Sequence, residues 1–468
     1  MTDFTCKNII SNKIPVGTTN LFFHDDNNKL QPGDIPDSVT HIFFGGKYDQ
    51  PLDISVIPNS VTHLNFGYSF NQPLSPGVIP NSVTHLTFGK SFNQILQPRV
   101  IPDSVTHLNF EEKFNHSLNL HVIPNSVTHL RLGWCHFDQP LICEIIPITV
   151  THLDLGSCFN HEIKNSIPFS VTHLVFGNKF NRLLEPGDIP NSVTHLTFGS
   201  DFDQPLSPGV IPNSVKYLFF GSSFNQTLNI GDIPNSVTHL NLGGRFNRML
   251  QPGVIPKSVN YLTLGYCFNR PLNIGDIPNS VIKLVLSSYF NQQLNIGDIP
   301  DSVTHLAFGY YFNQSVKPRV IPNSVTHLSI GCYIDRKLNE IDIPSSVTHL
   351  IVGYLGKGKL DNWHTPNSVT HLVFISDVCG IDPTLITDSI IYVLLRSEYS
   401  DNELENISED IFLQISSPHS REIINKWTPT RCKYFENKEI YERSFISRLN
   451  SSILHDIPIE LLLYLLEY

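Results

Sequence analysis

Apolar residues recur along this chain in a fixed pattern that is clearest in residues 57–74, IPNSVTHLNFGYSFNQPL. With Val61 counted as the first position, apolar side chains stand at the first, fourth and sixth positions, and polar residues or glycine alternate with them. This alternation predicts a strand with one buried face. We therefore expect Leu64 and Phe66 to point inward and His63 to point outward.

The residues around this strand predict the rest of the unit. Phe70 and Leu74 are expected to supply two more inward side chains. Pro58 precedes the strand, where its missing N–H costs no ladder hydrogen bond. Pro76 and Gly77 make the return segment extended or turning rather than helical. One unit is therefore a short parallel strand, a tight corner and an irregular back.

Copies of this unit cover most of the chain. The Ile-Pro pair that opens each copy recurs every 22 residues, apart from one step of 23 and one of 21. The copies begin at Ile35, Ile57, Ile79, Ile101, Ile123, Ile146, Ile167, Ile189, Ile211, Ile233, Ile255, Ile277, Ile299, Ile321 and Ile343, and a sixteenth begins at Pro366. A fixed period in this range predicts a solenoid in which each copy is one turn of a stack.

The strand spacing resembles that of a leucine-rich repeat, whose strand carries apolar residues at its first, fourth and sixth positions. The chain is more closely similar to the FNIP repeat family, whose two signatures stand here as Phe70-Asn71 and Ile79-Pro80. This resemblance covers roughly residues 14–376. It implies a repeat scaffold for protein binding, of the kind found in social amoebae and giant amoebal viruses, with no known catalytic residues.

We therefore expect a repeat solenoid, a leucine-rich-repeat-like parallel β horseshoe of about sixteen 22-residue turns with a small C-terminal helical region. Residues 1–34 are predicted to form an N-terminal cap with a degenerate first turn that opens at Ile14. Residues 35–376 are the predicted solenoid. From residue 377 onward proline and glycine thin out and helical periodicity begins, so residues 377–468 are predicted to form a helical C-terminal region.

Charge and hydropathy exclude several classes of protein. The formal net charge is −11, and residues 377–468 carry 8 Lys and Arg against 16 Asp and Glu, so the repeats are nearly neutral. A nucleic-acid binder would carry a basic stripe, which is missing here. The N-terminal residues lack a signal-peptide pattern and no apolar stretch approaches membrane-spanning length. We expect a cytoplasmic protein, in the host cytoplasm if it is viral.

The eight cysteines show no CxxC pair or zinc spacing. Cys135 and Cys158 both stand near the ninth position of consecutive turns and are expected to be neighbours. Free thiols in a reducing compartment are the expected state, with a disulfide between these two residues as the alternative.

The third strand position forms a row of histidines. It holds His41, His63, His85, His107, His129, His152, His173, His195, His239, His305, His327, His349 and His371, with Tyr217, Tyr261 and Lys283 as the exceptions. In a parallel stack these side chains are expected to line up about 4.8 Å apart on the concave face. A stacked structural row, contact with a partner and metal binding all remain open, although a straight row does not converge on one tetrahedral metal ion.

Two further rows accompany the histidines. An Asn or Asp follows the Phe of most turns, as at Asn71 and Asp138, and we expect it to bond backbone groups at the corner. The fifth and eighth strand positions vary from turn to turn, as at Asn65, Arg131 and Tyr68. Changing outward residues on a fixed scaffold predict either a binding surface or merely tolerated surface positions.

The residues predicted to bind a partner on the concave face come from these rows. They are His63, His85, His107, His129, Arg131, Trp134, Asp154, His173, His195, Tyr217, His239, Tyr266, His305, Tyr310 and His327.

The last residues of the chain resemble the opening of an F-box, in which a Pro and a Glu lead into a Leu-rich helix. A shortened F-box behind a repeat array is similar to the arrangement in poxviral ankyrin-repeat proteins. The resemblance implies binding to a ubiquitin-ligase adaptor through residues 453–468, and an amphipathic end helix is the alternative. The residues concerned are Ile457, Pro458, Glu460, Leu461, Leu462 and Leu465.

Two classes of function remain. The first is a non-enzymatic scaffold that binds a protein on its concave face and recruits it to a cullin-type ubiquitin ligase through the tail. The second is a metal-binding or enzymatic surface built on the histidine row. Outside the repeat pattern itself, no catalytic triad, phosphate loop or carboxylate pair stands out. We therefore expect no enzymatic activity and no cofactor.

Overall fold

The computed structural model describes residues 3–6, 14–23, 28–331, 341–353, 366–374 and 392–395. These residues form short strands joined by turns and irregular segments, and they include no helix. The chain divides into two units. Unit 1 comprises Met1–Phe268 and Gly275–Ser280, and unit 2 comprises Asn269–Ile274 and Val281–Tyr468.

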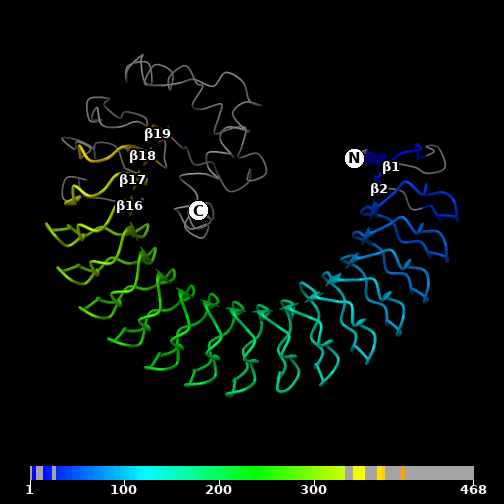
Figure 1. Cartoon of the computed structure of the whole chain (residues 1–468), viewed down its shortest axis with the longest axis horizontal. Coiled ribbons are helices and arrows are strands. Elements are labelled where there is room, and N and C mark those ends of the chain that lie inside the picture. Colours follow the sequence, from blue (N-terminus) through cyan, green and yellow to red (C-terminus); the bar gives the residue numbers. More distant parts are fainter. Residues whose placement is uncertain are drawn as a thin grey trace, which may run out of the picture. The chain divides into compact units, whose positions relative to one another are not determined.

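The strands of unit 1 run parallel to one another, and each pairs with the next along the chain (Figure 1). They are β1 (Asp3–Cys6), β2 (Asn20–Phe23), β3 (His41–Phe43), β4 (His63–Asn65), β5 (His85–Phe88), β6 (His107–Phe110), β7 (His129–Leu132), β8 (His152–Asp154), β9 (His173–Val175), β10 (His195–Thr197), β11 (Tyr217–Phe219), β12 (His239–Asn241) and β13 (Tyr261–Thr263). From β3 onward, every pair aligns the third strand position of one turn with that of the next.

Unit 2 continues the same kind of parallel pairing. Its strands are β14 (Lys283–Val285), β15 (His305–Ala307), β16 (His327–Ile330), β17 (His349–Val352), β18 (His371–Phe374) and β19 (Tyr392–Leu395). Each pairs with the next, in the same register as in unit 1.

The predicted parallel solenoid is confirmed, with one strand at the expected place in each copy from β3 to β18. β4 ends at Asn65, and Gly67, two residues later, adopts a left-handed conformation with φ of 69°. Phe66 stays in line nevertheless, since its N–H donates to the carbonyl oxygen of Thr87 on the next turn at 3.0 Å.

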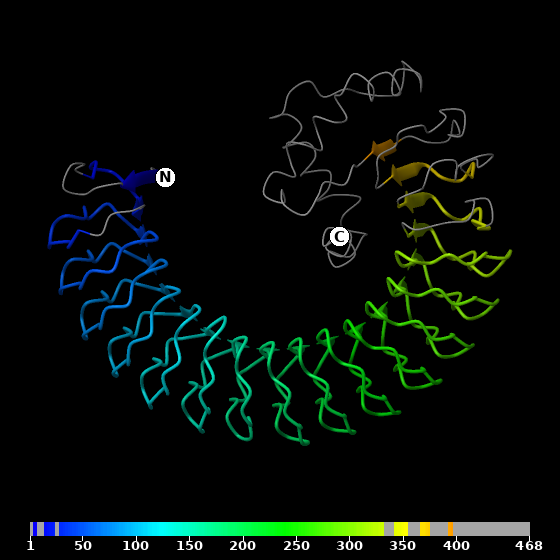
Figure 2. The same ribbon diagram turned by 180° about the vertical axis from the view of Figure 1, so that it is seen from behind.

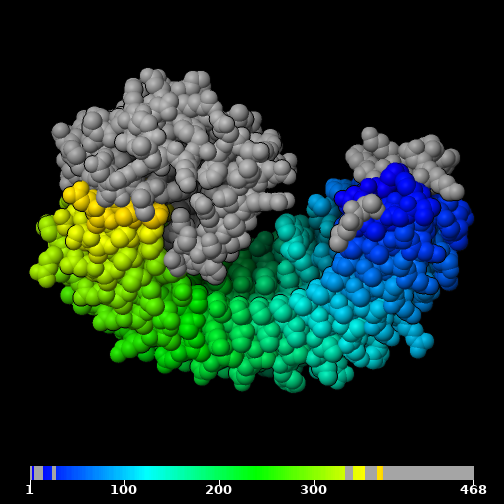
Figure 3. Space-filling model, turned by 45° about the horizontal axis from the view of Figure 1, so that its top comes forward, coloured from blue at the N-terminus to red at the C-terminus, as the bar shows by residue number. Residues whose placement is uncertain are grey.

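The core consists of columns of identical positions. Val61, Leu64, Phe66 and Phe70 are each 0–2% exposed, and their equivalents in later turns are buried in the same way. Aromatic rings in one column stack from turn to turn, for example Phe66 on a neighbouring ring 5.7 Å away in the next turn. In the space-filling view the turns of unit 1 lie directly against one another (Figure 3).

Glycine at the seventh position lets consecutive turns approach closely. A Cβ atom on Gly89 would lie 1.5 Å from the carbonyl oxygen of Gly67, so a side chain there would force the turns apart. Within unit 1 the strands lie on the inner side of the arc formed by the turns, and the return segments lie on the outer side (Figure 2). Outward-pointing strand residues therefore share one face, which we call the strand face of unit 1.

Residues 377–468 are predicted to be helical, but residues 392–395 form the strand β19, which pairs with β18, so the prediction is wrong there. The rest of this region lies outside the described residues, and so do its F-box-like residues Ile457, Pro458, Glu460, Leu461, Leu462 and Leu465. Residues 14–23 of the predicted cap form one turn with β2, in which Leu21 and Phe23 are buried.

Candidate functional site

The histidines of the third strand position form a stacked row on the strand face of unit 1. From His41 to His195 consecutive imidazole rings lie 4.0–4.2 Å apart, centroid to centroid, and are nearly parallel. Tyr217, His239 and Tyr261 continue the row at 4.1–4.3 Å. The predicted stacked row is therefore confirmed, with a spacing slightly below the strand separation.

Each imidazole is held by the threonine that precedes it. Nδ1 of His63 lies 2.9 Å from the hydroxyl oxygen of Thr62, and the same contact measures 2.9–3.0 Å in the other turns from β3 to β10. The Thr62 hydroxyl also lies 3.2 Å from the carbonyl oxygen of Thr40 on the preceding turn. The rings are therefore fixed both by stacking and by a polar contact to the backbone of the neighbouring turn.

The pKa values of several imidazoles in the row are lowered. Burial is the largest cause of the lowered pKa at His63, His85 and His107, and charge repulsion from neighbouring imidazoles comes second. The pKa values of His152 and His173 are lowered for the same reasons. Loss of hydration therefore lowers these pKa values more than repulsion between the rings does.

A charged and aromatic patch lies beside the row on β4 to β8 and the residues that follow these strands. At the eighth position the side chain of Lys90 lies 5.4 Å from the ring centre of Tyr68 and 2.8 Å from the carboxylate of Glu112. Tyr68 is 56% exposed. Lys90 therefore contacts both an aromatic ring and a carboxylate.

The second cation of the patch is Arg131. Its guanidinium lies 5.0 Å from the ring centre of Trp134, which is 54% exposed, and its Nε lies 3.1 Å from a carboxylate oxygen of Asp154. The last two atoms are at ion-pair distance but are not aligned for a hydrogen bond, so their attraction is chiefly electrostatic. We call the six residues Tyr68, Lys90, Glu112, Arg131, Trp134 and Asp154 the Trp134 patch.

Some of the variable residues on this face stabilise the backbone turn that follows the strand. Oδ1 of Asp154 accepts a hydrogen bond from the N–H of Gly156 at 2.9 Å, and Oδ1 of Asn65 accepts one from Gly67 at 2.8 Å. Both glycines have positive φ angles, so the carboxylate or amide stabilises the turn after the strand. Burial raises the pKa of Asp154, and the hydrogen bond from the N–H of Gly156 and the charge of Arg131 both oppose that increase. Part of the residue variation at the fifth strand position, which predicts a binding surface, is therefore explained by the turn that follows the strand.

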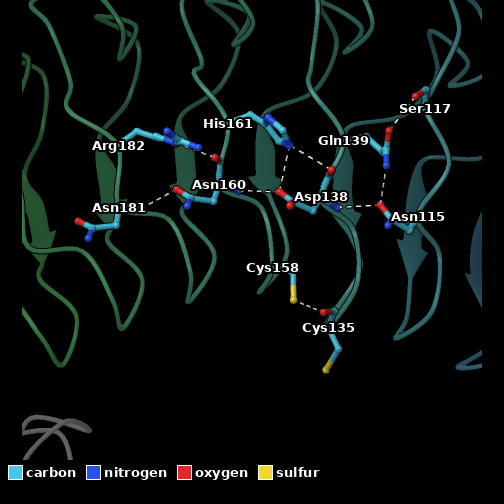
Figure 4. A network of polar contacts seen from close by, with 10 residues as sticks. All are labelled: Asn115, Ser117, Cys135, Asp138, Gln139, Cys158, Asn160, His161, Asn181 and Arg182. Carbon is cyan, nitrogen blue, oxygen red and sulfur yellow. Dashed lines mark hydrogen bonds and ion pairs between the residues drawn. The ribbon is translucent and has the colours of Figure 1, made fainter.

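The Asn and Asp residues after the Phe form a second polar row, and their predicted structural role is visible in Figure 4. Oδ1 of Asn115 accepts from the N–H of Asp138, Oδ1 of Asp138 from Asn160, and Oδ1 of Asn160 from Asn181, at 3.0–3.1 Å. The following residue often bonds the same group, as Gln139 does with Asn115 at 2.9 Å. Oδ1 of each of these three residues therefore joins its turn to the next one.

The remaining predicted site residues are spread more widely. Tyr266, in unit 1, and Tyr310, in unit 2, are both half-exposed, and Tyr310 packs edge-on against Tyr311 at 4.9 Å. His305 and His327 stack at 4.2 Å in unit 2. The structure therefore brings together the patch and the row of unit 1, and it stacks His305 on His327 within unit 2.

Four cysteines and the candidate metal ligands lie within the described residues. Cys135, Cys143, Cys158 and Cys267 are free thiols. The thiol of Cys158 contacts the carbonyl oxygen of Cys135, so the two are neighbours as predicted (Figure 4). No group of three or more His, Cys, Asp or Glu residues in the described ranges is arranged to hold a metal ion. Across those ranges, no helix has the length and apolar character needed to cross a membrane.

Three features of the described residues were not evident from the sequence. One is the pair Lys90–Glu112, which stands 22 residues apart and could have been found by aligning the turns in columns. Another is Glu111, which takes the place of a glycine in its column and whose pKa is raised chiefly by burial. The third is the exposed stacked pair Tyr289 and Tyr311 in unit 2, 4.7 Å apart, for which the sequence gives only an aromatic residue in each turn.

Comparison with protein families shows that the FNIP Repeat family matches eight consecutive segments, residues 7–47, 48–91, 92–135, 137–179, 180–223, 224–267, 268–311 and 312–355. Comparison with curated proteins gave no match. Among solved structures, the chain is similar to CroV588, a giant-virus protein described as a novel circular LRR protein, with 36% identity and a TM-score of 0.70. This similarity covers 82% of the chain and 60% of CroV588, so the chain spans little more than half of that protein.

A weaker similarity links the chain to the functional domain of InlJ from Listeria monocytogenes, which is described as including a cysteine ladder. Identity is 12% and the TM-score is 0.40, over 72% of this chain and 70% of that domain, so no conclusion about this chain follows from it. The match to CroV588 shows a leucine-rich-repeat-like parallel β solenoid, a fold typical of protein-interaction scaffolds and typically non-enzymatic.

Proposed function

This chain belongs to the FNIP repeat family, and from that premise we propose that it is a scaffold that binds another protein through the strand face of unit 1. The observation that carries this proposal is the Trp134 patch. It places a half-exposed Trp and an Arg, two residue types enriched at binding hot spots, side by side on the rigid face of the solenoid.

The charges of the patch favour a protein partner. Both cations are already paired with carboxylates, so the patch offers no run of free positive charge for a phosphate backbone. The Arg131 side chain is held between Trp134 and Asp154, so little further side-chain entropy is lost when a partner covers it. A preorganised aromatic surface with both signs of charge suits a mixed polar and apolar protein surface.

The test is affinity capture with the full chain and two single variants. Trp134→Ala should weaken capture of a bound protein by about thirtyfold, because truncating a hot-spot residue costs about 2 kcal/mol or more. The thermal midpoint should stay nearly unchanged, since Trp134 is half-exposed. Phe169→Ala is the matched control, because Phe169 is 83% exposed and lies outside the strands. Equal capture by the Trp134 variant and the parent chain, or equal losses in both variants, would refute the proposal.

We further propose that this binding takes place in the cytoplasm and recruits the bound protein to a cullin-type ubiquitin ligase through residues 453–468. The support is the F-box-like run of Pro458, Glu460 and leucines in the sequence. The same capture experiment tests it with a chain that lacks residues 453–468. Loss of ligase subunits on truncation, with the other captured protein retained, is the expected result. Their absence from the intact chain's capture would overturn this part alone.

A further inference from the structure

Threonine and histidine occur together in the turns of this chain. Each of the thirteen histidines at the third strand position follows a threonine, whereas the three turns without histidine have Lys216-Tyr217, Asn260-Tyr261 and Ile282-Lys283. Tyr217 stacks in the row as closely as an imidazole does, 4.2 Å from His195. Stacking therefore requires only a flat ring, and the threonine is present only where the ring is an imidazole.

The contacts of the threonine hydroxyl define the protonation of the ring. The Thr84 hydroxyl carries one hydrogen and lies 3.2 Å from the carbonyl oxygen of Thr62 and 2.9 Å from Nδ1 of His85. Both contacts are hydrogen bonds at once only if the hydroxyl donates to the carbonyl and Nδ1–H donates to the hydroxyl. In a neutral imidazole Nε2 then carries a lone pair.

The Nε2 atoms of the row remain available to a partner. From His41 to His195, Nε2 has no hydrogen-bond partner among the described residues and is not among their buried, unbonded polar atoms, so it reaches solvent. This differs from the row of Asn and Asp residues, where Oδ1 of Asn115, Asp138 and Asn160 each accept a hydrogen bond from the next turn. Unit 1 therefore presents eight acceptor atoms in a line of about 30 Å, one per strand spacing.

The charged groups on this face pair with one another and not with the row. Arg131 and Asp154, two positions beyond His129 and His152, form an ion pair with each other, and Lys90 pairs with Glu112. Lys216 lies near His195 and lowers its pKa together with burial, the largest cause, and the imidazoles of His152 and His239. None of the ion pairs found in the described residues joins a carboxylate to the row. No carboxylate of these ion pairs therefore stabilises the protonated form of the imidazoles.

We propose that the Thr–His row of unit 1 is a hydrogen-bond acceptor surface that binds an extended peptide segment through its lysine or arginine side chains. This inference rests on the proposed protein-binding function and specifies the chemistry of the partner. A charged N–H donor forms stronger hydrogen bonds than a neutral one. An anionic segment would face lone pairs instead of donors. Side chains on one face of an extended segment recur about every 6.6 Å, whereas the imidazoles recur about every 4.1 Å, and lysine and arginine side chains are long and flexible enough to bridge this difference.

The first measurement determines the tautomer in the full chain. Nuclear magnetic resonance of histidines labelled with ¹⁵N, recorded at pH 7.5, distinguishes an imidazole protonated at Nδ1 from one protonated at Nε2. Protonation at Nδ1 in the Thr–His turns is expected. Protonation at Nε2 would overturn the proposal, because the row would then present donors.

The second measurement titrates the chain with a fluorescein-labelled peptide of six Lys-Ser repeats and with the corresponding Glu-Ser peptide. The test variant is Thr84→Val, Thr106→Val and Thr128→Val together, which keeps the charge and the stacked rings but removes the contact to Nδ1. We expect it to bind the Lys-Ser peptide about tenfold more weakly, a change of about 1.4 kcal/mol. The control for this triple variant replaces three threonines of the fifth position, Thr87, Thr197 and Thr263, by valine, since they lie on the same face without touching an imidazole.

The outcomes separate this inference from the proposed function. Equal binding of the Lys-Ser peptide by the test variant and its control, or tighter binding of the Glu-Ser peptide than of Lys-Ser, would overturn the acceptor surface. Affinity for the Lys-Ser peptide should also fall between pH 7.5 and pH 5.5, because protonated imidazoles repel it, and a constant affinity would count against the inference. If these tests succeed while Trp134→Ala leaves protein capture unchanged, the proposed function fails and the acceptor surface stands.

Discussion

Replacement of Phe180 by alanine tests whether the aromatic column carries the stability of the solenoid. Phe180 is fully buried, and its ring centre lies 4.3 Å from that of Phe176 in its own turn. It lies 6.4 Å from Phe159 in the preceding turn and 6.2 Å from Phe202 in the next. Truncation therefore leaves a cavity between three turns. The hydrogen bonds between their backbones fix the spacing of the turns, so the turns cannot close the cavity.

The expected cost follows from this geometry. A buried Phe→Ala change costs about 3–5 kcal/mol, and the upper part of this range applies because three stacked turns cannot collapse onto the gap. Since each turn contacts only its neighbours, the loss should be local, and unfolding should separate into more than one step.

Guanidinium unfolding followed by hydrogen exchange with mass spectrometry measures both quantities. Amides of β8 to β10 should lose protection in Phe180→Ala, while those of β3 and β4 keep it. Phe169→Ala is the matched control, because the same residue type is 83% exposed there and should change the free energy of unfolding by less than about 0.5 kcal/mol. A single transition with an unchanged midpoint, or equal losses in both variants, would show that the column does not stabilise the stack.

Two further predictions concern the polar rows. Burial lowers the folded-state pKa of His85, His107 and His152. The unfolded chain therefore binds more protons than the folded chain as the pH falls. The stability that depends on these histidines should be fully present above about pH 6.5 and should be lost as pH falls from 6.5 towards the lower folded-state pKa values. Denaturation at pH 7.5 and 5.5 should show a smaller loss when these three are changed to Gln, and an equal loss would contradict this reasoning. Asn181→Ala removes the acceptor for the N–H of Asp203 and for the side chain of Gln204, and should cost about 1–3 kcal/mol. Asn181→Asp keeps the acceptor, as Asp138 does in the same column, so calorimetry should show a clearly smaller loss, and equal losses would argue against the bond.

The sequence predicts the core of this protein well because the core is periodic. Val61, Leu64, Phe66 and Phe70 are buried where the alternation and the 22-residue period place them. The role of Asn71 follows equally well, since its side-chain oxygen accepts the N–H of the equivalent residue one turn later at 2.8 Å. Both depend only on contacts between identical positions of neighbouring turns.

Contacts between different positions are harder to predict. Arg131 stands at the fifth position and Trp134 at the eighth, and only the turn after β7 brings the guanidinium over the ring. The bond from Gly156 to Asp154 depends on a left-handed glycine, which the sequence does not reveal. Burial, the main cause of the lowered pKa of His63, is equally hard to predict, because it arises from packing and not from the spacing of the histidines along the chain.

The two irregular turns show where this architecture accommodates change. The copy that opens at Ile123 has 23 residues and the one at Ile146 has 21, yet His129, His152 and His173 still pair in register. The extra residue lies in the corner between Gly133 and Phe137, and the missing one in the return segment between Ile163 and Ile167, so the strands and their columns are undisturbed. If a whole 22-residue copy were gained or lost, the turns that then became neighbours would still present matching surfaces to each other. Such a gene can therefore lengthen, shorten or shuffle its surface by whole modules, and the outward residues can diversify without any redesign of the interior.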